Sequence, residues 1–390
     1  MSQREPVWLK ILRIALGLLF LFSSISKAVD PVNFGITMND YFVSFGMGFL
    51  KPVALLAGVA AITCEFVLGC MMLLRVRVNL TAWGYLLFMT FFFFLTLWLA
   101  VAEYMEIHGI HYFGVVHDCG CFGQVVKMSN MTTFLKNIVI IIPTIIVFAN
   151  RKRIPDIGLT QLGQWILVAL FVAIAVIFQL HCIRHLPAID FSDWKKGNDV
   201  VKAFIEQPAK KESSFVYRSN ADNKEVILSE TELMEQDMSF YDNYEYVDRT
   251  DKEVEPGKKA EIDGFNMLDE NGADHAFEYI NSDAKVYLLF IHDVNEVKAK
   301  SMANLRAIVA DCDQRDIPFV AVTNSDEDDV AAFIEKYQIE FPIYRNPIDP
   351  AHGPFMVRDA IRSNPGLVYI DKGVVKEKWA WRDIPAKCLD

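Results

Sequence analysis

Long apolar runs fill the first half of the chain and are absent from the second half. Five of these runs approach the length of about 20 residues that an α-helix needs to cross a bilayer. The fourth contains Pro143, which a membrane helix tolerates when neighbouring groups satisfy the freed backbone. Residues 1–182 are therefore predicted to be a helical membrane domain with five spans. The spans cover residues 7–28, 50–74, 79–103, 132–149 and 162–180.

The second half has the pattern of a water-soluble protein. Residues 183–255 are rich in Lys, Glu, Asp, Ser and Tyr, so we expect a polar linker region with short strand-like pieces such as 214–217. Strands alternating with helices and ending in a hairpin predict an α/β domain over residues 256–390. Its predicted strands are 262–268, 286–292, 319–324, 365–370 and 373–379, and its predicted helices are 296–313 and 326–337.

The short flanks of the spans carry basic residues on one side only of a five-span arrangement. This bias predicts that side to be cytoplasmic. The loops 29–49 and 104–131 and everything after the fifth span then face the periplasm of a bacterial inner membrane. The basic residues are Arg4, Lys10, Arg13, Arg75, Arg77, Arg151, Lys152 and Arg153.

The net charge of −11 lies mostly in the second half of the chain. A basic footprint for nucleic acid is absent. We therefore expect membrane lipid and exported or envelope proteins as partners, and no nucleic acid.

The most informative polar loop reads His-Asp-Cys-Gly-Cys-Phe-Gly over residues 117–123. Cys119 and Cys121 flank one glycine, which relaxes the strain of a small disulfide ring. A strained, exposed disulfide exchanges readily, and His117 lowers the pKa of a neighbouring thiol when it is protonated. Cys182 lies just beyond the fifth span on the same side, either as a resolving thiol or as a free interfacial one.

Three uses of these two cysteines remain open: thiol–disulfide exchange, a structural bridge, and metal capture. The metal hypothesis would add His108, His111, His117, His181 or His185 as ligands for zinc or copper. Because the spacing matches no common zinc motif, we expect no metal.

Glu65 is a carboxylate inside the second span. Counted along the helix axis, it lies roughly 15 Å from the Arg75 end of that span and Arg13 lies about 10 Å from the same side. These depths predict an Arg13–Glu65 pair, with Lys27 at the opposite face and out of reach. An intramembrane charge points to proton handling, quinone contact or transport; the alternative is an ion pair that locks two helices.

The first two spans resemble the DoxX-like membrane family. The resemblance rests on Arg13 and Gly17 near the start of the first span, on its exit Lys27-x-x-Asp30-Pro31, and on Glu65 followed by Gly69 in the second span. The CGCFG string is similar to the MauE branch of that family, the methylamine utilisation proteins. The resemblance covers residues 8–150 and implies a four-helix core plus a fifth helix. It also implies a role in disulfide formation in an exported partner, with a quinone as electron carrier in related proteins.

The final segment resembles the thioredoxin-like fold of periplasmic peroxiredoxin and TlpA-type proteins. Asn364 and Pro365 begin the string Asn-Pro-Gly-Leu-Val-Tyr-Ile-Asp-Lys-Gly, which is similar to the cis-proline strand of that fold. The resemblance implies partner binding around these two residues. Those enzymes carry Cys-x-x-Cys after the strand that corresponds to 286–292, whereas this chain reads Asp-Val-Asn-Glu over 293–296. We expect Cys312 to be a packing residue and Cys388 to be exposed or frayed.

Two functions follow. The first is an inner-membrane thiol–disulfide oxidoreductase, quinone-linked, that exchanges equivalents between Cys119–Cys121 and an exported thiol. The second is a scaffold or assembly protein whose nucleophile-free thioredoxin-like domain binds an envelope partner.

Overall fold

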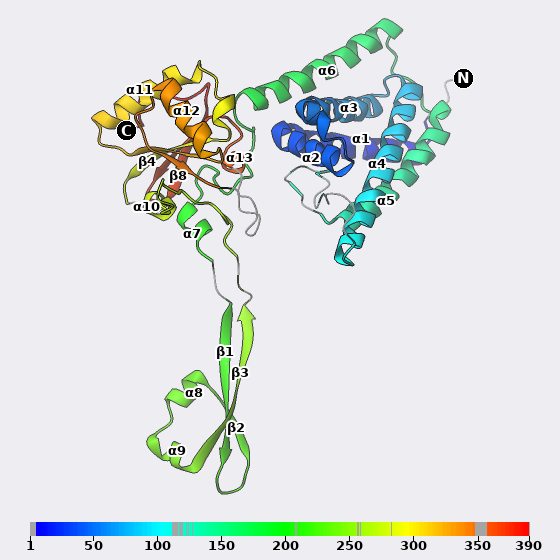
Figure 1. The fold of residues 1–390 in the computed structure, drawn as a ribbon. Helices are drawn as coiled ribbons and strands as arrows, with labels where there is room; N and C mark the ends of the chain where they lie inside the picture. The colour runs from blue at the N-terminus through cyan, green and yellow to red at the C-terminus, as the bar shows by residue number, and fades with distance from the viewer. Residues whose placement is uncertain are drawn as a thin grey trace.

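Two regions make up the molecule: a helical bundle and a mixed α/β region with a projecting arm (Figure 1). The computed structural model describes residues 5–110, 116, 120, 121, 123, 125, 126, 128–206, 209–255, 257, 259–281, 283–347 and 357–389. Within these, five helical segments are long and apolar enough to cross a membrane, which confirms the five predicted spans. They are α1 (Val7–Ala28), η1 (Gly48–Val53) continuing into α3 (Ala54–Leu74), α4 (Val78–Ile107), α5 (Asn130–Ala149) and α6 (Gln161–Arg184).

A further helix, α2 (Pro31–Ser44), lies in the segment we expected to be a loop. The Asp30 side chain accepts a hydrogen bond from the Asn33 backbone N–H at 3.0 Å, and Pro31 occupies the first helical turn. A carboxylate N-cap followed by proline is a helix start signal. The signal is present in the sequence, but the helix is too short to be recognised as a span.

At the end of the bundle where α4 begins, hydrogen bonds hold α6 and the loop before it against α4. The Arg77 backbone N–H donates to Gln164 Oε1 at 2.9 Å, and the Val78 N–H donates to Asp156 Oδ1 at 2.7 Å. These bonds satisfy backbone donors at the start of α4, which have no partner within their own helix. The loop before α6 thereby caps α4.

A five-stranded sheet with the order β6-β5-β4-β7-β8 forms the centre of the α/β region. β4 pairs in parallel with β5, and β5 with β6, whereas β7 and β8 are antiparallel to their neighbours. The strands are β4 (Lys285–Ile291), β5 (Phe319–Thr323), β6 (Ile343–Arg345), β7 (Gly366–Asp371) and β8 (Val374–Ala380); the helices are α7 (Val200–Phe204), α10 (Ala276–Ile280), η3 (Val294–Glu296), α11 (Ser301–Gln314), α12 (Glu327–Tyr337) and α13 (Val357–Ala360).

Four predicted strands and both predicted helices of this region are present, with α11 beginning five residues later than expected. The predicted strand 262–268 is not formed. Gly264 takes a φ of +71°, which interrupts an extended segment, and Leu268 makes only isolated bridges. The strand prediction was wrong because apolar content alone does not show a backbone turn.

Part of the expected polar linker belongs to the core of this α/β region. Trp194 and Val200 are fully buried against one face of the sheet. Lys378 of β8 pairs with Asp190 and donates to the Ala360 carbonyl at 2.7 Å. Burial lowers the pKa of Lys378, and the Asp190 carboxylate only partly opposes this. A few apolar residues therefore fix a segment whose average composition is polar.

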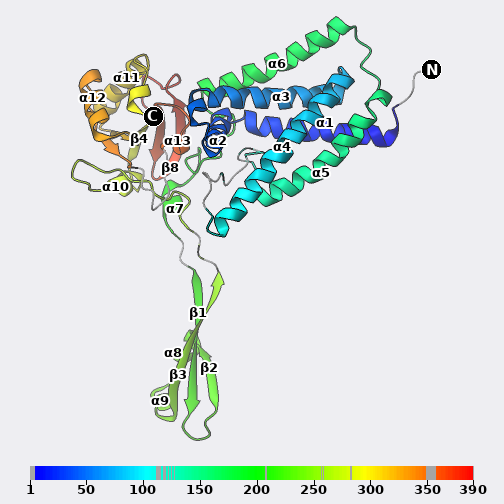
Figure 2. The same ribbon diagram turned by 45° about the vertical axis from the view of Figure 1, so that its right-hand side comes forward.

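The rest of the expected linker forms an arm that projects away from both regions (Figures 1 and 2). Its sheet has the order β2-β1-β3, and Tyr217 makes edge contacts with the rings of Phe240, Tyr241 and Tyr246. Its elements are β1 (Lys210–Ser219), β2 (Glu225–Ser229), α8 (Glu230–Met234), α9 (Met238–Asn243) and β3 (Tyr244–Glu255).

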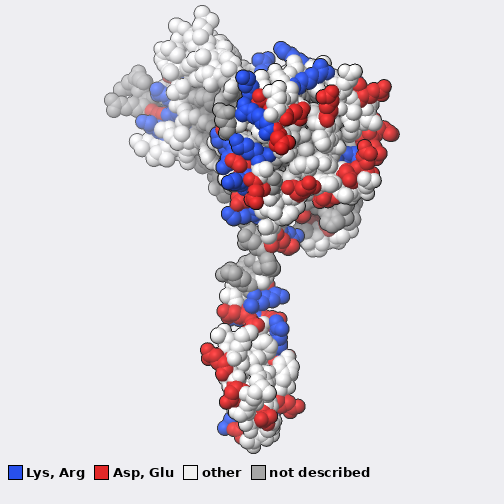
Figure 3. Space-filling model, turned by 90° about the vertical axis from the view of Figure 1, so that its left-hand side faces the viewer, with Lys and Arg blue, Asp and Glu red and all other residues white. Residues whose placement is uncertain are grey.

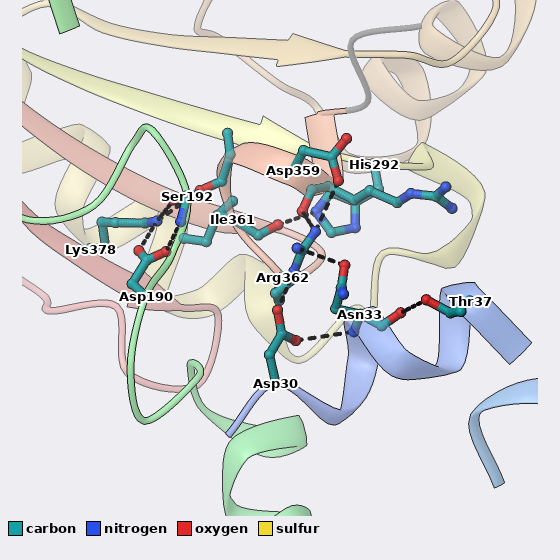
Figure 4. Close-up of polar contacts among 12 residues, drawn as sticks. Asp30, Asn33, Thr37, Asp190, Ser192, His292, Asp359, Ile361, Arg362 and Lys378 are labelled. Carbon is teal, nitrogen blue, oxygen red and sulfur yellow. Dashed lines mark hydrogen bonds and ion pairs between the residues drawn. The ribbon is translucent and has the colours of Figure 1, made fainter. Parts of the chain in front are cut away.

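Arg362 fastens the α/β region to the bundle. Its Nε lies 2.9 Å from Asp30 Oδ2, and its Nη2 donates to Asn33 Oδ1 at 3.2 Å (Figure 4). Burial lowers the pKa of Arg362, but the carboxylates of Asp30 and Asp359 outweigh it, so the pKa is raised. Arg362 therefore stays charged at the junction.

We expect Arg362→Ala to weaken the contact between the α/β region and the bundle without unfolding either of them. Removing one partner of a largely buried charge pair costs about 2–5 kcal/mol. Hydrogen exchange of the full-length protein should become faster at the start of α2 and in residues 357–365. Arg306→Ala, at an exposed site on α11, is the matched control. Unchanged exchange in Arg362→Ala would show that the contact does not hold the regions together.

Candidate functional site

A buried ion pair joins α1 to α3 inside the bundle. Lys27 Nζ lies 2.5 Å from Glu65 Oε2, and both side chains are almost fully excluded from solvent. The ammonium group has three donors, and the other two contact Ser23 Oγ and the Cys121 carbonyl oxygen, each at 3.0 Å. All of its hydrogen-bonding capacity is therefore used within the protein.

The predicted Arg13–Glu65 pair is not formed. Arg13 instead contacts Glu5 at 2.8 Å and donates to the carbonyls of Met72 and Leu73 at 2.7 and 2.8 Å. These carbonyls are among the last of α3, which have no partner within the helix. Arg13 therefore caps α3 at the end of the bundle away from the Cys-Gly-Cys loop.

The direction in which side chains extend from a helix explains why Glu65 pairs with Lys27 and not with Arg13. In an α-helix every side chain leans toward the N-terminus of its helix. α1 and α3 run antiparallel, so Arg13 leans out of the bundle while Lys27 leans into it, and Glu65 leans toward Lys27. Counting depth along the axis ignored this lean, which is why Lys27 was wrongly excluded.

The ion pair also anchors the Cys-Gly-Cys loop. The Cys121 carbonyl accepts from Ser23 Oγ at 2.8 Å as well as from Lys27. Ser23 and Lys27 are four residues apart and therefore lie on the same face of α1. Two buried donors of α1 thus fix the backbone of one cysteine of the pair.

Both glycines of the loop are required by its geometry. Gly120 and Gly123 have φ values of +62° and +54°, and the Gly123 N–H donates to the Gly120 carbonyl at 3.0 Å. A Cβ on Gly123 would lie 2.8 Å from the Ser26 carbonyl oxygen, and one on Gly120 would lie 3.2 Å from Thr37. The loop therefore turns tightly against the end of α1 and against α2.

Cys121 is half-buried beside a small polar cavity. Glu65, Lys27 and Lys136 line this cavity together with Cys121. Lys136 was not recognised from the sequence, although a basic residue inside a predicted span is itself a signal. His117 and Cys119 lie outside the described residues. Cys182 is buried at the end of α6 and forms no disulfide with any described residue.

An apolar groove of ≈ 930 Å³ lies between α2, α3 and α4. Phe88 and Phe92 line both this groove and the polar cavity, so they separate the two. Cys64 lies on the groove wall and is exposed. Trp98 Nε1, at the groove, is buried and has no acceptor among the described residues.

The Pro365 segment is held to β4 by Asn364. Its Oδ1 accepts from the His292 backbone N–H at 3.0 Å, and its Nδ2 donates to the Asp293 carbonyl at 2.9 Å. The Asn364–Pro365 peptide bond is cis, and Pro365 is buried. Both the oxygen and the nitrogen of the Asn364 side-chain amide thus form hydrogen bonds inside the domain. The predicted role of these two residues in partner binding stays a prediction.

Helix α2 connects this segment to the Cys-Gly-Cys loop. Thr37 of α2 lies against Gly120, and Asn33, one turn earlier, contacts Arg362. Figure 4 shows Arg362 reaching from beyond α13 to the start of α2, with His292 beside it. One short helix therefore contacts both the cysteine loop and the segment that leads to Pro365.

The sequence comparison agrees with the bundle. Residues 6–150 match the family model of the methylamine utilisation protein MauE. The match ends at the close of α5, so the MauE-like region comprises α1 to α5 and the cysteine loop. α6, the arm and the α/β region lie beyond it. No curated protein matches the chain.

A double-mutant cycle tests the Lys27–Glu65 pair. Lys27→Met or Glu65→Gln alone should cost about 3–5 kcal/mol of unfolding free energy, because each leaves a buried group unpaired. The double variant should cost clearly less than the sum. Unfolding in mixed micelles supplies the free energies.

The matched control is a cycle of Arg13→Met with Glu65→Gln, whose effects should add to within about 0.5 kcal/mol. If the Arg13 and Glu65 substitutions were coupled and the Lys27 and Glu65 substitutions were additive, Glu65 would pair with Arg13 and the assignment to Lys27 would be wrong.

His292 makes the α/β region sensitive to acid. Burial lowers its pKa from 6.5 to about 4, the Ile361 carbonyl opposes this, and Arg362 and Arg358 add to it. The unfolded chain therefore binds a proton first as the pH falls. The stability that neutral His292 supplies is complete above pH 6.5, and about 3 kcal/mol of it should be lost by pH 4.

Thermal unfolding of the full-length protein from pH 7 to pH 4 measures this loss. His292→Gln should flatten the difference, whereas His108→Gln, at an exposed histidine after α4, should not. Parallel curves for the wild type and His292→Gln would contradict the assignment.

Proposed function

We propose that the protein is a membrane thiol–disulfide exchange protein whose Cys119–Cys121 pair reacts with a thiol of an exported partner. The observation that carries the proposal is the attachment of the Cys121 carbonyl to the buried Lys27–Glu65 pair. A loop that needed only to connect two spans would not require a desolvated ion pair as its anchor. Fixed geometry is what exchange between two closely spaced sulfur atoms requires.

The proposed orientation places the basic end of the bundle in the cytoplasm. Arg13, Arg77 and Arg151 lie at helix ends on the side away from the cysteine loop. Positive residues in short loops favour the cytoplasmic side. The cysteine loop and the α/β region then share the periplasmic side of a bacterial inner membrane.

We infer that the α/β region is thioredoxin-like. The support is a parallel β4–α11–β5 unit and an antiparallel β7–β8 hairpin beside β4. Asp293 follows β4 where a nucleophilic cysteine would stand, and its carboxylate caps η3. The domain therefore guides a partner and leaves the sulfur chemistry to the membrane loop.

The apolar groove fits a membrane quinone as the electron acceptor. Trp98 Nε1 is a buried donor without an acceptor among the described residues, and the aromatic wall suits an isoprenoid tail. When bound, a quinone supplies an acceptor for two electrons and two protons. Phe88 and Phe92 keep the groove apart from the polar cavity beside Cys121.

The arm is the surface that we assign to the partner. Residues 225–248 contain eight Asp or Glu residues and no Lys or Arg. Acidic side chains lie along the arm in Figure 3. Met234 and Met238 are about four-fifths exposed among them. Adaptable methionines within a charged surface suit a partner with basic side chains.

The second candidate is a scaffold. Asp293 in place of a nucleophile and the Arg362–Asp30 contact favour it, because they give the α/β region a fixed position without chemistry of its own. In that case the cysteine pair is a structural bridge.

Alkylation trapping in intact membranes separates the two functions. In the exchange function, mild reductant makes Cys119 and Cys121 accessible to alkylation in one sample. In a second sample, a quinone added after the reductant and before the alkylating agent protects them again. Cys119→Ser and Cys121→Ser should each abolish the recovery, whereas Cys70→Ser, in the interior of the bundle, should leave it intact. Cysteines that remain in one state throughout would favour the scaffold.

A further inference from the structure

Two cysteines far apart in sequence meet inside the α/β region. Cys312 on α11 and Cys388 near the C-terminal end are both buried, and their Sγ atoms are 2.8 Å apart. Non-bonded carbon atoms pack at about 3.5–4.0 Å, and sulfur is the larger atom. The two sulfur atoms are therefore closer than packing alone would bring them. The expectation that Cys388 is exposed or frayed was wrong.

The backbone of the tail holds Cys388 in this place. The Cys388 N–H donates to Asp311 Oδ2 at 2.8 Å, and the Leu389 N–H donates to the Tyr287 hydroxyl at 2.8 Å. Ile384 is buried in the same apolar cluster as Cys312 and Cys388. Asp311 precedes Cys312 on α11, so the tail is fixed directly beside the second thiol.

We propose that Cys312 and Cys388 form a disulfide that fastens the C-terminal tail to α11. Each thiol loses a proton, one S–S bond forms, and two electrons pass to a protein disulfide of the same compartment, which is reduced to two thiols. The sulfur atoms need to close to about 2.05 Å. The proposal rests on the proposed periplasmic position of this domain, where disulfides persist.

The environment marks this bond as structural rather than exchanging. Burial raises the pKa of both thiols, and the contact with Cys388 raises the pKa of Cys312 further. A buried neutral thiol is inert to exchange because the thiolate is the nucleophile. The bond therefore forms during folding, before the tail closes over α11, and is protected afterwards.

Peptide mapping of the full-length protein tests the bond. Cells are lysed into N-ethylmaleimide together with denaturant, so that buried free thiols are also alkylated, and the purified protein is digested with trypsin without reductant. We expect residues 307–315 and 388–390 as one cross-linked species, which separates after reduction. Recovery of both cysteines as alkylated peptides from the unreduced sample would overturn the proposal.

Thermal unfolding with and without reductant provides a second measurement. A bond that closes a loop of this length should raise the melting temperature of the domain by roughly 10 °C. Reductant should remove that increment from the wild type but not from Cys388→Ala, and Cys70→Ala should behave as the wild type. An equal effect of reductant on wild type and Cys388→Ala would contradict the bond.

The failure of this proposal can be told apart from failure of the proposed function. If the cross-link is present while Cys119 and Cys121 remain locked, the disulfide stands and the exchange function fails. If Cys119 and Cys121 cycle while Cys312 and Cys388 are alkylated, only the disulfide is overturned.

Discussion

The Lys27–Glu65 pair is the interaction on which the bundle depends. Two charges removed from water are tolerated only when their geometry is good and their remaining hydrogen-bonding capacity is met. Glu65 is the first partner of the Lys27 ammonium, and Ser23 and the Cys121 carbonyl are the second and third, so satisfying the ammonium requires the cysteine loop to be in place. The loop, α1 and α3 therefore all meet at the Lys27 ammonium.

The Asp30 carboxylate also makes one contact within its own segment and one contact with a distant region. It caps α2 through the Asn33 N–H and receives Arg362 from the α/β region. The cap orients α2, and α2 in turn presents Thr37 to Gly120. The position of the α/β region is thus linked to the cysteine loop by a helix of only 14 residues.

The sequence predicts those features that depend on local pattern. The five spans and the strands β4, β5, β7 and β8 follow from the length and spacing of apolar runs. The pairing of Glu65 was missed because it depends on the lean of side chains on antiparallel helices. Trp194 and Cys388 were missed for another reason: each lies in a polar or terminal segment, and only tertiary packing reveals that it is buried. Asp30 and Pro31 did carry a readable signal for α2.

Asp293, which follows β4, and the junction at Arg362 both position the segment that leads to Pro365. The Asn364 side chain forms hydrogen bonds with the backbone of His292 and Asp293. Two residues earlier, Arg362 donates a hydrogen bond to Asn33 of α2. The residues that directly follow β4 are His292 and Asp293, so the α/β region has no thiol there to offer a partner. Under the proposed function, a thiol guided by this domain would react at the loop that α2 supports. The Lys27–Glu65 pair fixes that loop from inside the bundle. Under the proposed function, the reacting cysteines therefore belong to the bundle and the surface that guides the partner belongs to the α/β region. Helix α2 contacts both.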